Sequence, residues 1–140
     1  SEEDLRDMFL AFIEPYFEGT ATGETFNKSG KTDILLRFEG KNVFVAEGKR
    51  WRGQQSYLDA ISQLLGYLTW RDSKAAVMMF IKNKDISSVL QTIGQATSQH
   101  PNYLGLVSKQ EESWLNYRFH LSDDPNREVK LAVLLFHYPQ

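Results

Sequence analysis

The architecture of this chain is set by residues 32–49, which read TDILLRFEGKNVFVAEGK. Two runs rich in β-branched, aromatic and other apolar residues, 32–38 and 42–49, flank the tripeptide Glu39-Gly40-Lys41. Strand-forming runs on either side of a short glycine-containing segment are typical of a hairpin. We therefore expect two antiparallel strands here, joined by a tight turn.

Periodic patterns extend outward from this hairpin in both directions. Apolar residues at helical spacing predict helices, and alternating or continuous apolar runs predict strands. The expected elements are a helix over 1–16 disturbed by Pro15, a short strand over 24–27, a helix over 54–70, a buried strand over 75–81, a helix over 86–93 capped by Asp85, and strands over 103–107, 115–121 and 129–135. This order predicts one α/β domain over residues 1–140, with a mixed central sheet flanked by helices.

The long helix expected over 54–70 has two distinct faces. An apolar stripe centred on Ile61 and Leu65 should pack against the core. Gln63, Tyr67 and Trp70 lie roughly opposite that stripe. Two interpretations stay open for this second face: it is exposed to solvent or to a partner, or it turns toward a nucleic-acid groove in which aromatic rings stack on bases.

Composition limits the chemistry that this chain can carry out. It contains no cysteine, and His100, His120 and His137 show no ligand spacing, so a metal ion would be held by oxygen. Magnesium, manganese and calcium are the ions that prefer such ligands. Without a membrane-length apolar run or an export signal, a cytoplasmic protein that does not enter a membrane is expected. The chain does not begin with methionine, which fits a domain cut from a longer protein.

Charge is unevenly distributed, although the whole chain carries only −2. Residues 28–84 hold 11 Lys/Arg and 5 Asp/Glu, a net charge of +6, and the rest of the chain carries −8. A basic central segment between acidic flanks is what a surface that faces phosphate would produce. Ordinary scatter of charge over a solvated surface is the alternative interpretation.

Candidate catalytic groups gather at the ends of the two hairpin strands. Asp33 opens the first strand, and Glu47-Gly48-Lys49 closes the second. Side chains alternate along a strand, so Glu47 and Lys49 should project from the same face. Two carboxylates can bind a hard divalent cation, and a neighbouring lysine can polarise a water or a phosphate. This combination suits phosphodiester hydrolysis.

The spacing of these residues resembles the PD-(D/E)xK, or restriction-endonuclease-like, nucleases. Asp33, thirteen intervening residues and Glu47-Gly48-Lys49 match that pattern, although Thr32 stands where the motif's name has proline. Gln63-Leu64-Leu65-Gly66-Tyr67 resembles the Q-x-x-x-Y motif of the RecB-type and lambda-exonuclease-type branches. The resemblance implies a restriction-endonuclease-like fold and a divalent-metal-dependent nuclease that acts on nucleic acid, with DNA preferred.

The resemblance also implies a role for each matching residue. Asp33, Glu47 and the carbonyl of Gly48 would hold Mg²⁺ or Mn²⁺, Lys49 would act on the water or the scissile phosphate, and Gln63 would orient the site. Glu3 is the candidate accessory acid on the first helix. The residues proposed to contact nucleic acid are Arg50, Trp51, Arg52 and Tyr67. Further domains of a parent protein, or other copies of the chain in a homo-oligomer, are the other expected partners.

Two other classes of function remain open. A non-catalytic nucleic-acid-binding or protein-interaction module on the same fold is the main alternative to a nuclease. The second is a protein–protein domain whose Tyr67–Trp70 face docks a partner, which would show binding without metal dependence.

The proposed site also depends on the register of the hairpin. A regular two-residue turn would pair Asp33 with Gly48 and send Asp33 and Glu47 to opposite faces. We therefore predict a three-residue loop or a β-bulge that pairs Asp33 with Glu47.

Overall fold

The computed structural model describes residues 21–28, 31–38, 41–69 and 74–138, with side chains from Gly48 onward. The predicted first helix, with Glu3, and the tip of the hairpin lie outside the described residues. No helix in the described ranges is both long and apolar enough to cross a membrane.

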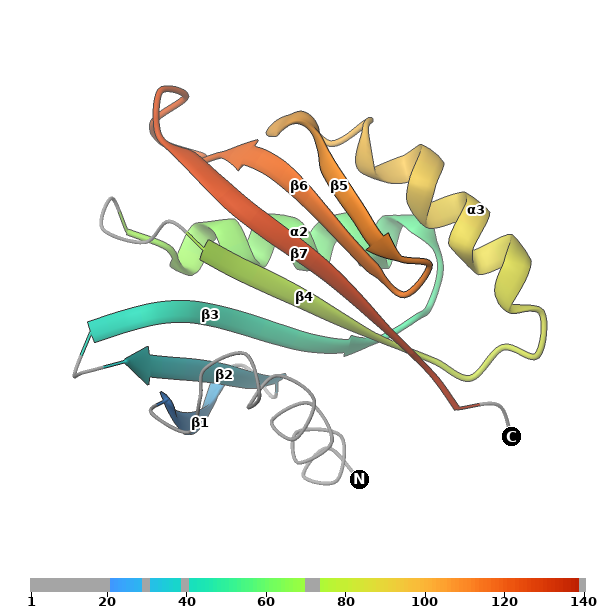
Figure 1. The fold of residues 1–140 in the computed structure, drawn as a ribbon, viewed down its shortest axis with the longest axis horizontal. Coiled ribbons are helices and arrows are strands. Elements are labelled where there is room, and N and C mark those ends of the chain that lie inside the picture. The colour runs from blue at the N-terminus through green and yellow to red at the C-terminus, as the bar shows by residue number, and fades with distance from the viewer. Residues whose placement is uncertain (1–20, 29–30, 39–40, 70–73, 139–140) are drawn as a thin grey trace.

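A mixed α/β fold is formed by the described residues, as the sequence predicts (Figure 1). Their strands make one seven-stranded sheet in the order β1-β2-β3-β4-β7-β6-β5. The strands are β1 Ala21–Lys28, β2 Lys31–Phe38, β3 Lys41–Arg50, β4 Lys74–Ile81, β5 Tyr103–Glu111, β6 Trp114–His120 and β7 Glu128–His137; the helices are α2 Gln54–Tyr67 and α3 Ile86–Thr97.

Strand β4 lies at the centre of the sheet and is parallel to both of its neighbours, β3 and β7. The remaining pairs, β1–β2, β2–β3, β5–β6 and β6–β7, are antiparallel. The parallel β3–β4 pair requires a crossover, which α2 supplies, and this explains why a helical pattern follows the first hairpin in the sequence. The outer antiparallel hairpins therefore extend from a short parallel centre.

The core lies between the sheet and the two helices. Ala75, Val77, Met79 and Ile81 point from β4 into the cluster that contains the apolar stripe of α2 and the inner face of α3. The intervening residues of β4 are buried too, and every residue of 75–81 is at most 4% exposed. Because both faces are buried, β4 is continuously apolar and does not alternate, as the sequence of residues 75–81 predicts.

The helix boundaries differ slightly from those predicted. Helix α2 ends at Tyr67 and does not reach Trp70, since Leu68 already has extended dihedral angles, φ −78° and ψ 145°. Leu68 is buried all the same, so the chain continues into the core beyond the end of the helix. Helix α3 begins as predicted, because the Asp85 carboxylate accepts a hydrogen bond from the Ser88 N–H at 3.3 Å.

Candidate metal and nucleic-acid site

The hairpin formed by β2 and β3 contains the β-bulge that the sequence analysis predicts. Phe38 pairs with Lys41 and Arg37 with Asn42, but Leu36 pairs with Phe44, so one residue of β3 is skipped. The register then continues regularly until Asp33 is opposite Glu47. The alternative pairing of Asp33 with Gly48 is therefore wrong. Directly opposed residues of an antiparallel pair lie on one face of a sheet, so the backbone places these two positions on a common face.

That common face is the one covered by helices. In the parallel β3–β4 ladder, Glu47 is aligned with Val77 and Lys49 with Met79. Val77 and Met79 belong to the core cluster that contains α2. Lys49 is partly buried and takes part in an interaction within the chain. The three positions of the predicted Asp–Glu–Lys set therefore share the α2 side of the sheet.

The β2–β3 ladder ends at these positions. Asp33 opposite Glu47 is its last pair, whereas β3 continues through Gly48 to Arg50 as a partner of β4. Beyond Asp33, the start of β2 remains paired with β1. Ladder pairing between β2 and β3 therefore stops at Gly48, the residue whose carbonyl is the predicted third ligand of the metal ion.

Helix α2 presents opposite flanks to the two halves of the sheet. Its buried centre lies between Ile61 and Leu64, both 0% exposed. At about 100° per residue, Ser62 lies on one side of that centre, where its Oγ is 2.8 Å from Nε2 of His100, near the start of β5. Gln63 and Tyr67 lie on the other side, away from α3. Because Ser62 points toward the β5 side of the sheet, this second flank lies on the β1–β3 side of α2.

Gln63 lies in the third turn of helix α2. Helix α2 runs back along β3 in the opposite direction (Figure 1). Gln63 is exposed, Tyr67 is partly buried, and both take part in interactions within the chain. The predicted orientation of this helix, with Ile61 inward and Gln63 outward, is confirmed.

The basic segment that follows β3 is only partly available to a ligand. Arg50 and Arg52 are exposed, but Trp51 is half-buried and packs against the core. The Trp51 indole lies 5.9 Å from the Tyr57 ring, and its backbone N–H donates to the carbonyl of Phe80 at 2.9 Å. Trp51 therefore anchors the start of α2, which leaves the two arginines as the more accessible cations of this segment.

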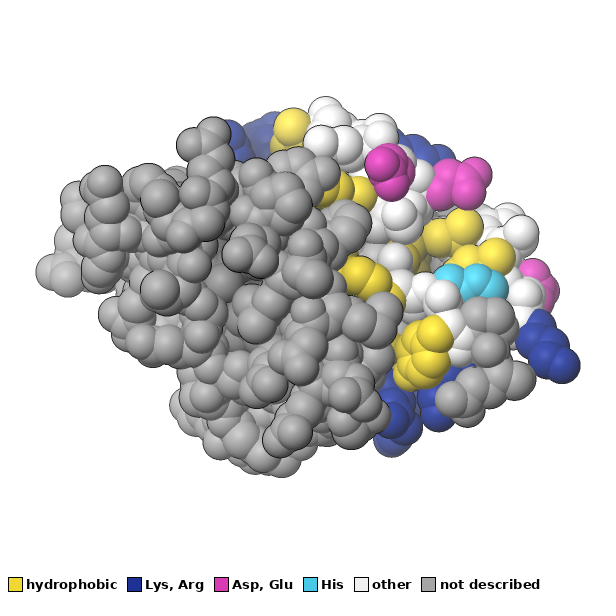
Figure 2. All heavy atoms as spheres, turned by 60° about the horizontal axis from the view of Figure 1, so that its bottom comes forward, with side chains coloured by type: hydrophobic (Ala, Val, Ile, Leu, Met, Phe, Trp, Pro, Cys, Tyr) yellow, Lys and Arg dark blue, Asp and Glu magenta, His cyan; other side chains and the backbone are white. Residues whose placement is uncertain are grey.

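Basic side chains are scattered over the part of the described surface that is visible in Figure 2. In that view, Lys and Arg side chains occupy separate places, with hydrophobic and polar side chains between them. Among the described residues, no group of three or more His, Cys, Asp and Glu side chains is placed to hold a metal ion. The side chains of Asp33 and Glu47 are not among those described. The donor set proposed from the sequence, two carboxylates and a carbonyl, fits a hard cation such as Mg²⁺.

A second polar cluster escaped the sequence analysis, because its members are far apart in the chain. His100 is 5% exposed, and its Nδ1 accepts a hydrogen bond from the Asn102 N–H at 3.0 Å. The ring proton of the neutral imidazole is therefore on Nε2, which donates to Ser62 Oγ. Burial lowers the pKa of His100, and the nearby His120 lowers it further. In this tautomer His100 cannot accept the Ser62 proton, so the pair is structural and not a nucleophile with its base.

Comparison of the chain with protein-family models, curated proteins and solved structures finds no match.

Proposed function

We propose that this protein is a Mg²⁺- or Mn²⁺-dependent nuclease of the restriction-endonuclease-like type, with DNA as its preferred substrate. The observation that carries the proposal is the register of the first hairpin. A single bulge brings Asp33 opposite Glu47, at the point where β2 and β3 cease to pair. Without that bulge, the two carboxylate positions would lie on opposite faces and could not share an ion.

The proposed chemistry assigns one task to each residue of the motif. Asp33, Glu47 and the Gly48 carbonyl would hold the cation, which lowers the pKa of a bound water and stabilises charge that develops on the phosphate. Lys49, two residues beyond Glu47 on the same face, would hold the attacking water or an oxygen of the scissile phosphate. Gln63, from the flank of α2 that faces this half of the sheet, would orient these groups by hydrogen bonding.

The charge of the same region supports a nucleic-acid substrate. Residues 28–84 carry +6 and include the whole motif, and Arg50 and Arg52 follow it on exposed positions. Cations beside a metal site can hold the phosphates on either side of the scissile bond, a contact that carries no sequence information by itself. We therefore expect binding that weakens steeply as salt is raised.

The alternative is a non-catalytic module on the same fold that binds nucleic acid or another protein. It would keep the fold and the salt-dependent binding but would have no use for a divalent cation. The two functions can be separated by adding Mn²⁺ to the protein and measuring its binding by titration calorimetry. A nuclease should bind Mn²⁺ and lose that binding in Asp33→Asn, whereas a binding module should not respond to either change.

Cleavage itself is the decisive test. Linear, circular and single-stranded DNA, and RNA, would be incubated with the protein in Mg²⁺, in Mn²⁺ and in chelator. We expect metal-dependent cleavage that Glu47→Gln and Lys49→Met each reduce by about a hundredfold or more.

Matched controls are available in the other half of the sheet. Glu111→Gln on β5 and Lys130→Met on β7 make the same chemical changes at exposed positions and should cleave like wild type. Circular dichroism would show that all four variants are folded. The nuclease assignment fails if Glu47→Gln or Lys49→Met cleaves within a few-fold of wild type.

A further inference from the structure

The carboxyl ends of the parallel strands lie together at one edge of the sheet (Figure 1). Strand β3 ends at Arg50, β4 at Ile81 and β7 at His137, and the ladders align these ends to within one residue. Glu47 is only three residues before the end of β3. Ligands of open α/β sheets bind outside the carboxyl ends of parallel strands. We call the segments at these ends, residues 50–52 and 82–84, the carboxyl edge.

Four exposed cations occupy the carboxyl edge. They are Arg50, Arg52, Lys82 and Lys84. The Trp51 N–H donates to the Phe80 carbonyl at 2.9 Å, so the two segments stay side by side beyond the last pair of the ladder. None of the four cations belongs to an ion pair among the described residues, and the two segments contain no acid. Positive charge is therefore concentrated at this edge.

The loop after β4 is held in place by β7. Nε2 of His137 donates to the Asn83 carbonyl at 2.6 Å, and Lys82 Nζ lies 5.9 Å from the centre of the Tyr138 ring. The acid that follows the loop, Asp85, accepts the hydrogen bond that caps α3. The loop therefore presents its two lysines from an ordered backbone, which reduces the entropy lost when a ligand binds.

The two lysines lie well beyond the proposed metal positions. Glu47 is level with Val77 in the β3–β4 ladder, and Lys82 is five residues further along β4, about 16 Å away at the rise of a strand. Arg50 alternates to the face opposite Lys49. These cations are therefore placed for the phosphates on either side of a scissile bond, and not for the scissile phosphate itself.

The opposite edge of the same strands has mixed charge. Lys74 and Lys130 are paired there, at the amino ends of β4 and β7. The neighbouring Arg118 and Arg127 each face a carboxylate, at 2.7 Å and 3.9 Å. Acids that alternate with cations weaken the attraction of a surface for a polyanion, so the amino edge is less suited to bind one.

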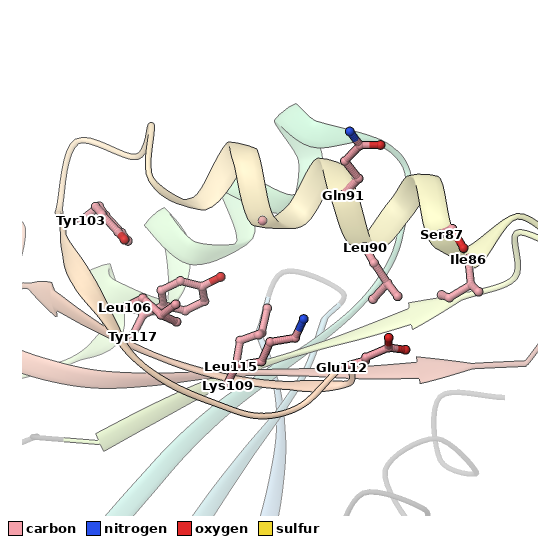
Figure 3. A pocket seen from close by; sticks show the side chains of 11 residues that line it. Ile86, Ser87, Leu90, Gln91, Tyr103, Leu106, Lys109, Glu112, Leu115 and Tyr117 are labelled. Carbon is pink, nitrogen blue, oxygen red and sulfur yellow. The ribbon is translucent and has the colours of Figure 1, made fainter.

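The β5–β6 half of the sheet has an apolar groove and not a basic surface. The groove, of about 510 Å³, lies between α3 and the β5–β6 hairpin (Figure 3). Leu90, Leu115 and Tyr117 line it, and its charged lining residues are one cation, Lys109, and one anion, Glu112. Residues 86–108 beside it contain no Asp, Glu, Lys or Arg. This region therefore has no excess positive charge with which to attract phosphates.

We propose that the carboxyl edge binds the phosphate backbone of nucleic acid on either side of the scissile bond, and that Lys82 and Lys84 belong to this contact together with Arg50 and Arg52. Unpaired cations in a row attract a run of phosphates, because each contact releases a counterion. The exposed large hydrophobic residues of the described chain lie on β5, at the other end of the sheet, so this edge offers a membrane little to insert. The choice of nucleic acid as the partner rests on the nuclease function proposed above.

Binding of labelled DNA and RNA to the whole chain, measured by fluorescence anisotropy in chelator over a range of salt, tests the proposal. Lys82→Met with Lys84→Met should weaken binding at least tenfold at low salt. The same double variant should reduce the slope of log affinity against log salt by about 2, since two phosphate contacts are lost. Lys82→Arg with Lys84→Arg keeps both charges and should bind like wild type.

A matched control is available at the amino edge. Lys74→Met with Lys130→Met removes the same charge from exposed positions and should bind within about twofold of wild type, because short-range contacts and not net charge carry most of the affinity. Circular dichroism would show that every variant is folded.

Three results would overturn the proposal. The first is a wild-type chain that binds neither DNA nor RNA at low salt. The second is equal weakening by the two methionine double variants, which would make the effect one of net charge alone. The third is binding to phosphatidylserine–phosphatidylcholine vesicles that needs Lys82 and Lys84 when binding of DNA and RNA does not. Because these measurements need no cleavage, a chain that binds through this edge without cleaving would disprove the nuclease function and support this proposal.

Discussion

The two hairpins at opposite ends of the sheet use β-bulges for different purposes. The β2–β3 hairpin has one register shift, next to Leu36, and is regular from there to Asp33. The β5–β6 hairpin has three shifts in nine residues of β5, and its paired positions recur at Tyr103, Leu106 and Lys109 on the side that lines the groove. One bulge gives two carboxylate positions a common face. Repeated shifts leave Leu104, Val107 and Gln110 of β5 without partners in the ladder.

The comparison shows that the number of residues inserted between two strand positions, odd or even, determines whether their side chains share a face. An odd number of inserted residues between two positions exchanges the faces of everything beyond them. In the first hairpin this exchange concerns Asp33 and Glu47, so the proposed metal site depends on it. In the second hairpin the inserted residues are Leu104, Val107 and Gln110, and the shifts return Tyr103, Leu106 and Lys109 to the side that lines the groove. Four predictions test this contrast, from the largest expected effect to the smallest.

Moving one carboxylate to the other face of the sheet should have the largest effect. Exchange of Thr32 and Asp33 (Thr32→Asp with Asp33→Thr) shifts the carboxylate by one position, so it no longer shares a face with Glu47, and should reduce metal-dependent cleavage by more than about a hundredfold. Val43, the residue of β3 skipped between the Leu36–Phe44 and Arg37–Asn42 pairs, provides the control. Its deletion makes the hairpin regular, leaves Asp33 opposite Glu47 and should preserve cleavage. If the exchanged variant cleaves normally, a common face is not what assembles the site.

The next effect concerns α2, which covers the first hairpin. Ile61 is 0% exposed, so Ile61→Ala should lower the free energy of unfolding by about 2–5 kcal/mol. Gln63→Ala, at an exposed position, should change the free energy of unfolding by less than about 0.5 kcal/mol. It should also reduce cleavage less than Lys49→Met does. Urea unfolding and cleavage rates measure the two quantities. If Ile61→Ala left the free energy of unfolding unchanged and Gln63→Ala unfolded the protein, the opposite face of the helix would be the buried one.

A smaller effect should appear at the start of the second hairpin, where His100 connects β5 to α2. Its pKa is lowered in the folded state, so the unfolded chain binds a proton more readily. Stability from this residue is fully present above about pH 6.5, the ordinary pKa, and is lost as pH falls below it. Unfolding free energies measured between about pH 7.5 and pH 5.5 should show this decline.

The control for this prediction is His100→Gln, in which the decline below the ordinary pKa should be reduced. Protonation of His100 would place a proton on Nδ1 and break the bond from Asn102, whose side chain also donates to the carbonyl of His120 at 3.0 Å. The first hairpin has no corresponding histidine in its sequence, residues 31–50. An identical pH profile for wild type and His100→Gln would contradict the assignment.

The smallest effect is expected for the ion pair that links β6 to β7. Arg118 Nε lies 2.7 Å from the Glu128 carboxylate, but both side chains are nearly half exposed, at 48% and 45%. Arg118→Gln should therefore lower stability by less than about 1 kcal/mol, and the loss should shrink further in high salt. A loss of several kcal/mol would show that side-chain pairs, and not backbone pairing, hold the second hairpin to the centre of the sheet.

Much of the fold could be predicted from local sequence. The buried strand of residues 75–81, the Asp85 cap of α3 and the inward face of α2 all follow from apolar periodicity and capping chemistry, which depend on neighbours within a few residues. The sequence also showed that Asp33 and Glu47 share a face only with a three-residue loop or a bulge between them, because alternation along a strand depends on residue spacing alone. Which of the two solutions the chain uses, a longer turn or a bulge next to Leu36, could not be predicted.

Contacts between distant segments were beyond prediction. Ser62 meets His100 across 38 residues, and Leu90 shares a groove with Tyr117 on another element. Trp51, which resembles a surface residue of a basic segment, is instead packed against Tyr57. Each of these arrangements depends on how α2, α3 and the sheet are stacked, and residue spacing carries no information about that stacking.

The sequence by itself determined the strand and helix pattern, the uncharged stretch of residues 86–108, and the candidate residues Asp33, Glu47 and Lys49. Only the tertiary structure decided that the three motif positions share the α2 side of the sheet, and that the uncharged stretch borders a groove. The physical reason is that composition and periodicity are local, whereas register and packing are settled when β4 brings the two hairpins into one sheet.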